Sequence, residues 1–148
     1  MNLQIIRIRH PPVVYLEQVA VLHTEEGFSA TSSDIRRRVA ALPGADRLLL
    51  AVDGESLIGY AHLRFSCDLF NEKTAEIVSL LVRHPHRRKN IGRRLITTAE
   101  TWARESGCSR LLLRADPDQS DAREFFTALG FSQGANLLEF ERLLGDEV

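Results

Sequence analysis

The spacing of apolar residues changes along the chain between a helical and a strand-like period. Ile91, Leu95, Ala99 and Trp102 recur every three or four positions, which predicts an amphipathic helix over residues 91–106. Within residues 57–65 the apolar side chains fall on every second position, as in a half-buried strand. On the same grounds we predict strands over residues 3–9, 48–52, 57–65, 75–82, 111–115 and 137–144, and helices over residues 14–24, 35–42, 91–106 and 121–129.

Turn-forming residues separate these segments. Asp53-Gly54 lies between two strands and is typical of a β-hairpin. The Ser-Ser-Asp segment at residues 32–34 offers oxygens that can cap the second helix. The apolar run that ends at Val82 is nearly unbroken, which predicts that this end of its strand is buried on both faces. The order of strands and helices predicts an α/β fold with a mixed sheet.

The composition indicates an ordinary globular chain with one local concentration of positive charge. With 148 residues, 44% of them apolar and 26% charged, the sequence is expected to form a single domain over residues 1–148. The formal net charge is −1, so the molecule as a whole has no attraction for nucleic acid. However, six of the 19 lysine and arginine residues lie between Arg83 and Arg94. A patch this local suits a small anion better than a nucleic-acid track.

Several classes of protein and site are not indicated by the sequence. No apolar run approaches the roughly 20 residues that span a bilayer, and arginines stand near the N-terminus where a signal peptide needs an apolar core. Cys67 and Cys108 match no metal-binding spacing, and His84 and His86 do not form a helical histidine pair. We therefore expect a cytoplasmic protein with reduced thiols, no membrane association and no metal site.

The most distinctive segment is the basic stretch that joins the strand ending at Val82 to the helix beginning at Ile91. A strand, a tight loop and a helix N-terminus bring backbone N–H groups, the positive end of a helix dipole and several cations into one small volume. The cations of residues 87–89 can add charge-assisted hydrogen bonds, and Gly92 removes a side chain where the helix would meet a ligand. The segment therefore predicts a phosphate-binding site, although it contains neither Gly-x-x-x-x-Gly-Lys-Ser/Thr nor Gly-x-Gly-x-x-Gly.

The pattern Arg87-x-x-Asn90-x-Gly92 resembles the Arg/Gln-x-x-Gly-x-Gly/Ala cofactor loop of the GNAT superfamily of N-acetyltransferases. Three further blocks resemble that superfamily in the same order: Ile58-Gly59-Tyr60-Ala61, Ala75-Glu76-Ile77-Val78 and the late helix that ends in Gly130-Phe131. The resemblance implies a single-domain fold with a mixed, mostly antiparallel sheet flanked by helices, and acetyl-CoA as the cosubstrate. It also implies that the diphosphate of acetyl-CoA is bound by Arg87, Arg88, Lys89, Asn90, Ile91, Gly92 and Arg93.

Asn90 stands where the superfamily usually has glycine. Asparagine is one of the few residues that tolerates the left-handed conformation, so we expect the tight turn to be kept.

The resemblance further implies roles in acetyl transfer to an amine. A primary amine, with a pKa near ~10.4, must lose a proton before it attacks. Glu76 is a charged residue in an apolar strand, and it matches the general base of the histone-acetylating branch. Backbone N–H groups near Leu81 and Val82 can polarise the thioester carbonyl if that strand splays or bulges. Phe126 stands where many members have a tyrosine acid; we expect it to contact the cofactor, and it cannot donate a proton.

Several alternatives stay open. Tyr60 and Cys108 are stand-ins for the missing acid. The acceptor is a small-molecule amine or a protein amine, such as a polyamine, an amino acid, an aminoglycoside, a protein N-terminus or a lysine. A catalytically silent acetyl-CoA-binding sensor or interaction module is the alternative function, because of Phe126 and Asn90. A last strand at the sheet edge leaves a homodimer open.

Overall fold

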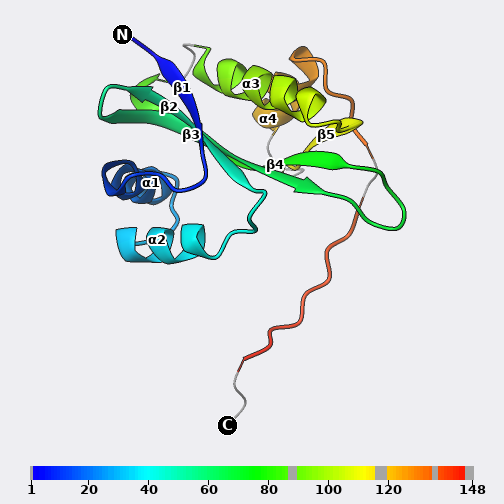
Figure 1. Cartoon of the computed structure of the whole chain (residues 1–148), viewed down its shortest axis with the longest axis horizontal. Coiled ribbons are helices and arrows are strands. Elements are labelled where there is room, and N and C mark those ends of the chain that lie inside the picture. The colour runs from blue at the N-terminus through cyan, green and yellow to red at the C-terminus, as the bar shows by residue number, and fades with distance from the viewer. Residues whose placement is uncertain (1, 87–89, 116–119, 135–136, 146–148) are drawn as a thin grey trace. The chain divides into compact units, whose positions relative to one another are not determined.

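The computed structural model describes residues 2–86, 90–115, 120–134 and 137–145. The chain forms two compact units, Met1–Arg114 and Ala115–Val148, which are described separately. The first unit holds a five-stranded sheet and three helices (Figure 1). The expectation of one domain over residues 1–148 stays a prediction.

The sheet of the first unit is mixed. Strands β1 to β4 pair antiparallel with their neighbours, and β5 lies parallel to β4 at the edge. The predicted α/β fold with a mixed, mostly antiparallel sheet flanked by helices is therefore confirmed. In order across the sheet, the strands are β1 (Gln4–Ile8), β2 (Arg47–Asp53), β3 (Ser56–Ser66), β4 (Thr74–Val82) and β5 (Arg110–Leu113).

Helices cover both faces of this sheet. Helices α1 (Val13–Glu25) and α2 (Ser32–Ala40) lie on one face, and α3 (Ile91–Glu105) lies on the other (Figure 1). On the α1 face, a cluster that includes Leu22, Leu50 and Tyr60 is almost fully buried. Burying each such side chain stabilises the folded state by roughly 1.5–3 kcal/mol. The buried residues of α3 are Ile91, Leu95, Ile96, Ala99 and Ala103, which follow the helical spacing read from the sequence.

Helix α2 begins earlier than predicted. Its N-cap is Thr31, whose hydroxyl oxygen accepts a hydrogen bond from the backbone N–H of Asp34 at 3.1 Å. The Asp34 carboxylate in turn accepts from the backbone N–H of Thr31 at 3.0 Å. This reciprocal capping box satisfies two N–H groups at the helix end, so the helix starts at Ser32 rather than residue 35.

A buried ionic cluster joins the start of β2 to β3. The carboxylate of Asp46, which is fully buried, accepts hydrogen bonds from His62 Nε2 at 2.7 Å and from Arg64 Nε at 3.0 Å. Because a buried carboxylate is costly without partners, these two bonds fix the register of β2 against β3 on the α1 face.

Two further predictions are wrong. Residues 137–145 form no strand, and their apolar side chains are exposed rather than paired in a sheet. The end of β4 is not buried on both faces: Val78 is 40% exposed, and residues 79–82 are half-buried. At that end β4 also extends beyond the last residue of β5. Among the described residues, no helix combines the length and the apolar character needed to cross a membrane.

Candidate active site

Strand β5 pairs with only the first part of β4. Their parallel ladder runs from Thr74 opposite Arg110 to Ile77 opposite Leu113, where β5 ends. Strand β4 continues to Val82 alongside β3. The second half of β4 therefore has one edge that β5 does not cover.

A β-bulge in β4 lies just beyond the point where β5 ends. His62 faces Ser79 across the β3–β4 ladder, and the next residue, Leu63, faces Ile77, so Val78 is an extra residue in β4. A bulge bends its strand and redirects the side chains that follow. The predicted polarisation of a thioester carbonyl by β4 depends on a splay or a bulge in the strand, and β4 contains the bulge.

The direction of the peptide groups shows which amide lies on the open edge. The N–H of Arg83 donates to the carbonyl oxygen of Ile58 at 2.8 Å, so Arg83 is directed toward β3. Peptide groups alternate along a strand, which directs Leu81 toward β3 and directs both Leu80 and Val82 toward the open edge. Leu80 was not named from the sequence, because an amide direction depends on the register.

Helix α3 begins beside the end of β4. Asn90 has φ 63° and ψ 16°, so the predicted left-handed conformation is confirmed. The first hydrogen bond of the helix runs from Arg94 N–H to the Asn90 carbonyl oxygen at 3.0 Å. Ahead of it, the N–H groups of residues 91–93 have no acceptor within the helix by geometry. Gly92 is half-buried and Arg93 exposed, whereas the Ile91 side chain is buried in the core.

The loop before α3 is basic but only partly described. Residues 84–86 form a short 3-10 helix after Arg83. The Arg83 Nε and His86 Nδ1 atoms are buried and have no hydrogen-bond partner among the described residues. Arg87, Arg88 and Lys89 lie outside the described residues, so the prediction that they bind a diphosphate is not tested.

Glu76 lies in β4 opposite Arg64 of β3. Its carboxylate accepts a hydrogen bond from Arg114, which follows β5, and the Glu76 side chain is 19% exposed. The residue is therefore next to the open part of β4, on the other side of the bulge from Ser79. Its role as a general base stays a prediction.

A hydrogen-bonded row crosses the α1 face near the bulge. Ser79 Oγ lies 3.3 Å from Tyr60 Oη, and Tyr60 Oη lies 2.7 Å from His23 Nε2. Burial raises the pKa of Tyr60, although the hydrogen bond from Ser79 acts in the opposite direction. Burial lowers the pKa of His23, and nearby Arg38 lowers it further. The Ser79 hydroxyl is thus bonded to a side chain of the neighbouring strand β3.

The two alternatives for a general acid differ in position. Tyr60 lies in β3 opposite Leu81, beside the open part of β4. Cys108 follows α3 and precedes Arg110, which pairs with Thr74 at the other end of β4. This placement favours Tyr60 over Cys108.

The second unit holds helix α4 (Ser120–Ala128). Phe126 is half-buried there and its ring lies close to those of Phe125 and Phe131, with centroids 5.6 and 6.2 Å away. Phe125 is 39% exposed. Contact between Phe126 and the cofactor stays a prediction.

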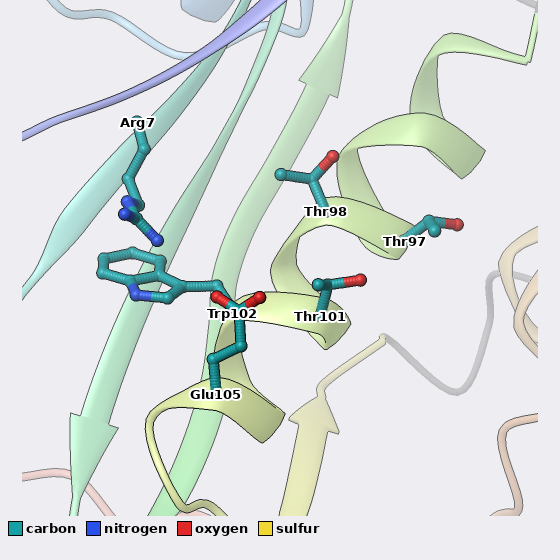
Figure 2. Close-up of a pocket in the computed structure, with 6 residues that line it drawn as sticks. All are labelled: Arg7, Thr97, Thr98, Thr101, Trp102 and Glu105. Atoms are coloured by element: carbon teal, nitrogen blue, oxygen red, sulfur yellow. The ribbon is translucent and has the colours of Figure 1, made fainter.

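A shallow pocket of about 290 Å³ lies along α3 rather than at the open part of β4. Figure 2 shows the Arg7 guanidinium over the Trp102 indole, with three threonines of α3 beside them; the Arg7 carbon lies 4.2 Å from the ring centroid. A cation over an aromatic face is a common packing contact. We assign this pocket no part in the candidate site.

The sequence pattern of the Acetyltransferase (GNAT) family matches residues 14–131. This covers most of the chain, including β4, β5 and the start of α3. The chain belongs to this family. It is an N-acetyltransferase, and its cosubstrate is acetyl-CoA.

Individual relatives support the membership. The chain is 26% identical over 111 residues to an aminoglycoside N(6')-acetyltransferase type 1 of Stenotrophomonas maltophilia, covering 72% of both chains. Its fold is similar to that of an aminoglycoside acetyltransferase from an uncultured soil sample (19% identity, 97% of both chains, TM-score 0.80). It is also similar to a structure described as a transcriptional regulator from Bacillus halodurans (20% identity, 95% of this chain and 100% of the other, TM-score 0.79). The shared fold thus occurs under more than one functional description, so it does not identify the acceptor.

Three residues at the open part of β4 or in the hydrogen-bonded row beside it were not singled out from the sequence: Leu80, His23 and Ser79. Each is ordinary in its own segment. The signal that unites them is the pairing of β3 with β4 and the packing of α1 on β3, which one sequence does not show.

Proposed function

We propose that this N-acetyltransferase transfers the acetyl group of acetyl-CoA to a primary amine of a small cationic molecule of the aminoglycoside class. The observation that carries the proposal is the open edge of β4, toward which the Leu80 amide is directed. In the sequence, this part of β4 comes shortly before the start of α3. The names of the relatives support the acceptor class. A protein amine is the other class of acceptor.

The described residues fit the two ends of acetyl-CoA. When bound, acetyl-CoA supplies an activated thioester. The Leu80 N–H, on the open edge of β4, can donate to the thioester carbonyl, and the neighbouring Leu81 and Val82 can line the chain of the cofactor. The helix amides of Ile91, Gly92 and Arg93 can donate to the diphosphate.

Further contacts to the cofactor are proposed from the sequence. The side chains of Arg87, Arg88 and Lys89 add cations beside the diphosphate, and Asn90 holds the turn that aims the helix amides. Phe126 packs against the cofactor in this proposal. The buried Arg83 Nε, with no partner among the described residues, is an additional donor near the loop.

Glu76 is proposed to bind and deprotonate the ammonium group of the acceptor. A carboxylate near the open part of β4 attracts a cation and can accept its proton. The Arg114 guanidinium engages one carboxylate oxygen, Oε2, and so orients the other oxygen of Glu76.

A coenzyme A titration and a thiol-release assay test the proposal. We expect coenzyme A to bind with measurable heat, and acetyl-CoA to release thiol when an aminoglycoside is added. Replacing Glu76 by Gln is expected to lower kcat by roughly 10²–10⁴-fold, the usual contribution of a general base. The matched control is Glu72→Gln, because Glu72 is an exposed carboxylate in the loop before β4.

The outcomes separate the candidate functions. Thiol release with aminoglycosides but not with lysine peptides supports the proposed acceptor, and the reverse supports a protein amine. Coenzyme A binding without any transfer would indicate the silent sensor. A Glu76→Gln variant with the native rate at every pH would remove Glu76 from the mechanism.

We also propose that the chain acts in the cytoplasm as a single domain over residues 1–148 and that it forms a homodimer. The dimer is supported by the exposed apolar side chains of residues 137–144, which a second copy of the chain would cover.

A further inference from the structure

A row of three hydrogen-bonded side chains connects the open part of β4 with the end of α1. Ser79 comes from β4, Tyr60 from β3 and His23 from the last turn of α1. Tyr60 is only 4% exposed, whereas Ser79 and His23 at the two ends of the row are half-buried. The row therefore starts beside the bulge, passes through the core and ends at the surface.

The contacts within the row are close and well aligned. The Tyr60 and His23 rings are stacked, with centroids 5.9 Å apart and an angle of 9° between their planes. This stacking holds His23 Nε2 at 2.7 Å from Tyr60 Oη. Ser79 Oγ donates to Tyr60 Oη at 3.3 Å, which leaves the serine lone pairs available to an N–H group from the β4 side.

We propose that Ser79, Tyr60 and His23 form a proton relay that carries the proton of the acceptor amine from β4 to the surface at the end of α1. The inference rests on the proposed N-acetyl transfer and adds to it the route by which the proton leaves. Glu76 does not replace this route, because Glu76 takes the proton of the ammonium group before attack, whereas the row takes the proton that the nitrogen loses as the amide forms.

The relay balances as a single net transfer. As the bond from the amine nitrogen to the acetyl carbon forms and the carbon–sulfur bond breaks, an amine proton moves to Ser79 Oγ. The serine hydroxyl proton moves to Tyr60 Oη, and the tyrosine hydroxyl proton moves to His23 Nε2. The ammonium group has by then given its first proton to Glu76, and the second passes along the row to the imidazole, which releases it to solvent. The thiolate of coenzyme A leaves as the carbon–sulfur bond breaks and takes a proton from solvent.

The electrostatic surroundings suit each member. His23 faces Tyr60 from β3, Arg38 from α2 and the ring of Phe28 from the segment after α1. Burial and the Arg38 charge lower the pKa of His23, so its imidazole is neutral and able to accept a proton near pH 7. The carbonyl end of α1 acts in the other direction and stabilises the imidazolium once it forms.

Tyr60 passes a proton on and does not itself remain ionised. Burial raises the pKa of its hydroxyl, so the phenolate is disfavoured and the group stays protonated between transfers.

The test is the pH profile of kcat, measured with saturating acetyl-CoA and an aminoglycoside. In the native protein we expect kcat to fall only at a pH below the usual imidazole pKa of about 6.5, because the pKa of His23 is lowered and a protonated His23 cannot accept the proton. Replacing Tyr60 by Phe, or His23 by Gln, is expected to lower kcat by roughly 10²-fold or more. Either change is also expected to remove the fall in kcat at low pH, which is the acidic limb of the profile. The double variant is expected to be no slower than the slower single variant, because either change interrupts the same row.

Two further measurements separate a relay from simple packing. Added imidazole is expected to restore part of the rate of His23→Ala, since His23 is half-buried and reachable from solvent. The control is Tyr15→Phe, which removes a tyrosine hydroxyl that donates to the Gly54 carbonyl oxygen at 2.8 Å and lies outside the row. This variant is expected to keep the acidic limb.

The relay is overturned if Tyr60→Phe and His23→Gln keep the native rate and acidic limb, a result that leaves N-acetyl transfer intact. It is equally overturned if both variants lose rate evenly at every pH and imidazole restores none of it. If the native protein transfers no acetyl group to any amine, the proposed function and the relay fail together.

Discussion

At the scale of single residues, Gly59 shows how closely β3 and β4 approach beside the open edge. A Cβ atom at residue 59 would lie 2.7 Å from the Leu81 carbonyl oxygen and 3.2 Å from the Val82 Cα atom. These are backbone atoms, which cannot move aside as a flexible side chain would. Glycine is needed here for space, since its φ is not in the left-handed region.

Replacing Gly59 by Ala is therefore expected to push β4 away from β3. We expect the free energy of unfolding to fall by about 1–3 kcal/mol, the usual cost of overpacking, measured as a shift in the urea midpoint. Gly44→Ala is the matched control, because no atom lies within 4 Å of the position of its added Cβ. A Gly59→Ala protein as stable as Gly44→Ala would contradict this account of the strand spacing.

Single residues also show which parts of the site can be predicted. The left-handed conformation of Asn90 follows from a property of asparagine itself, and it was predicted correctly. The bond between His23 and Tyr60 joins residues 37 positions apart, and no local preference of either residue indicates it.

At the scale of elements, the start of α3 depends on the conformation of Asn90. A residue at φ 63° turns the chain sharply so that the first N–H groups of the helix point out of the loop. The anion site proposed for the diphosphate needs this turn.

Two substitutions at residue 90 test the dependence. Asn90→Gly is expected to keep the turn and to bind coenzyme A at least as tightly as the native chain, because glycine adopts positive φ without strain. Asn90→Val is expected to lose about 1–2 kcal/mol of stability, since a branched side chain crowds the backbone in that region. Calorimetric titration and urea unfolding measure the two effects. Equal stability of the Gly and Val variants would show that the left-handed turn is not required.

Strand β4 differs along its length because of its neighbour. Its first half is paired on both edges, whereas its second half extends beyond the end of β5. Both halves are rich in apolar residues, so the sequence predicts uniform burial and cannot show where the partner strand stops.

At the scale of the whole molecule, the apolar residues after α4 are unusual. The side chains of Leu137, Leu138, Phe140, Leu143 and Leu144 are between 75% and 91% exposed. Monomeric proteins rarely expose so many large apolar side chains within one short segment, which supports the proposed homodimer.

The dimer is tested by sedimentation of the native chain and of a Leu138→Glu, Phe140→Glu double variant. We expect the native protein to sediment with twice the mass of one chain, and the double variant with the mass of one, because two charges oppose burial of the segment. Glu139→Gln is the control, since it changes an exposed polar residue between them. A native protein that stays monomeric at all concentrations would show that the segment has another role.

The sequence by itself determined most of the helices and strands, the basic loop before α3, the family resemblance and the left-handed Asn90. These follow from side-chain period, local charge and backbone preference, which act over a few residues. Only the tertiary structure decided which amide of β4 faces the open edge, where β5 ends, and that His23, Tyr60 and Ser79 form one row. The reason is that strand register and helix packing bring together residues far apart in the chain, and these contacts depend on the whole fold rather than on any one segment.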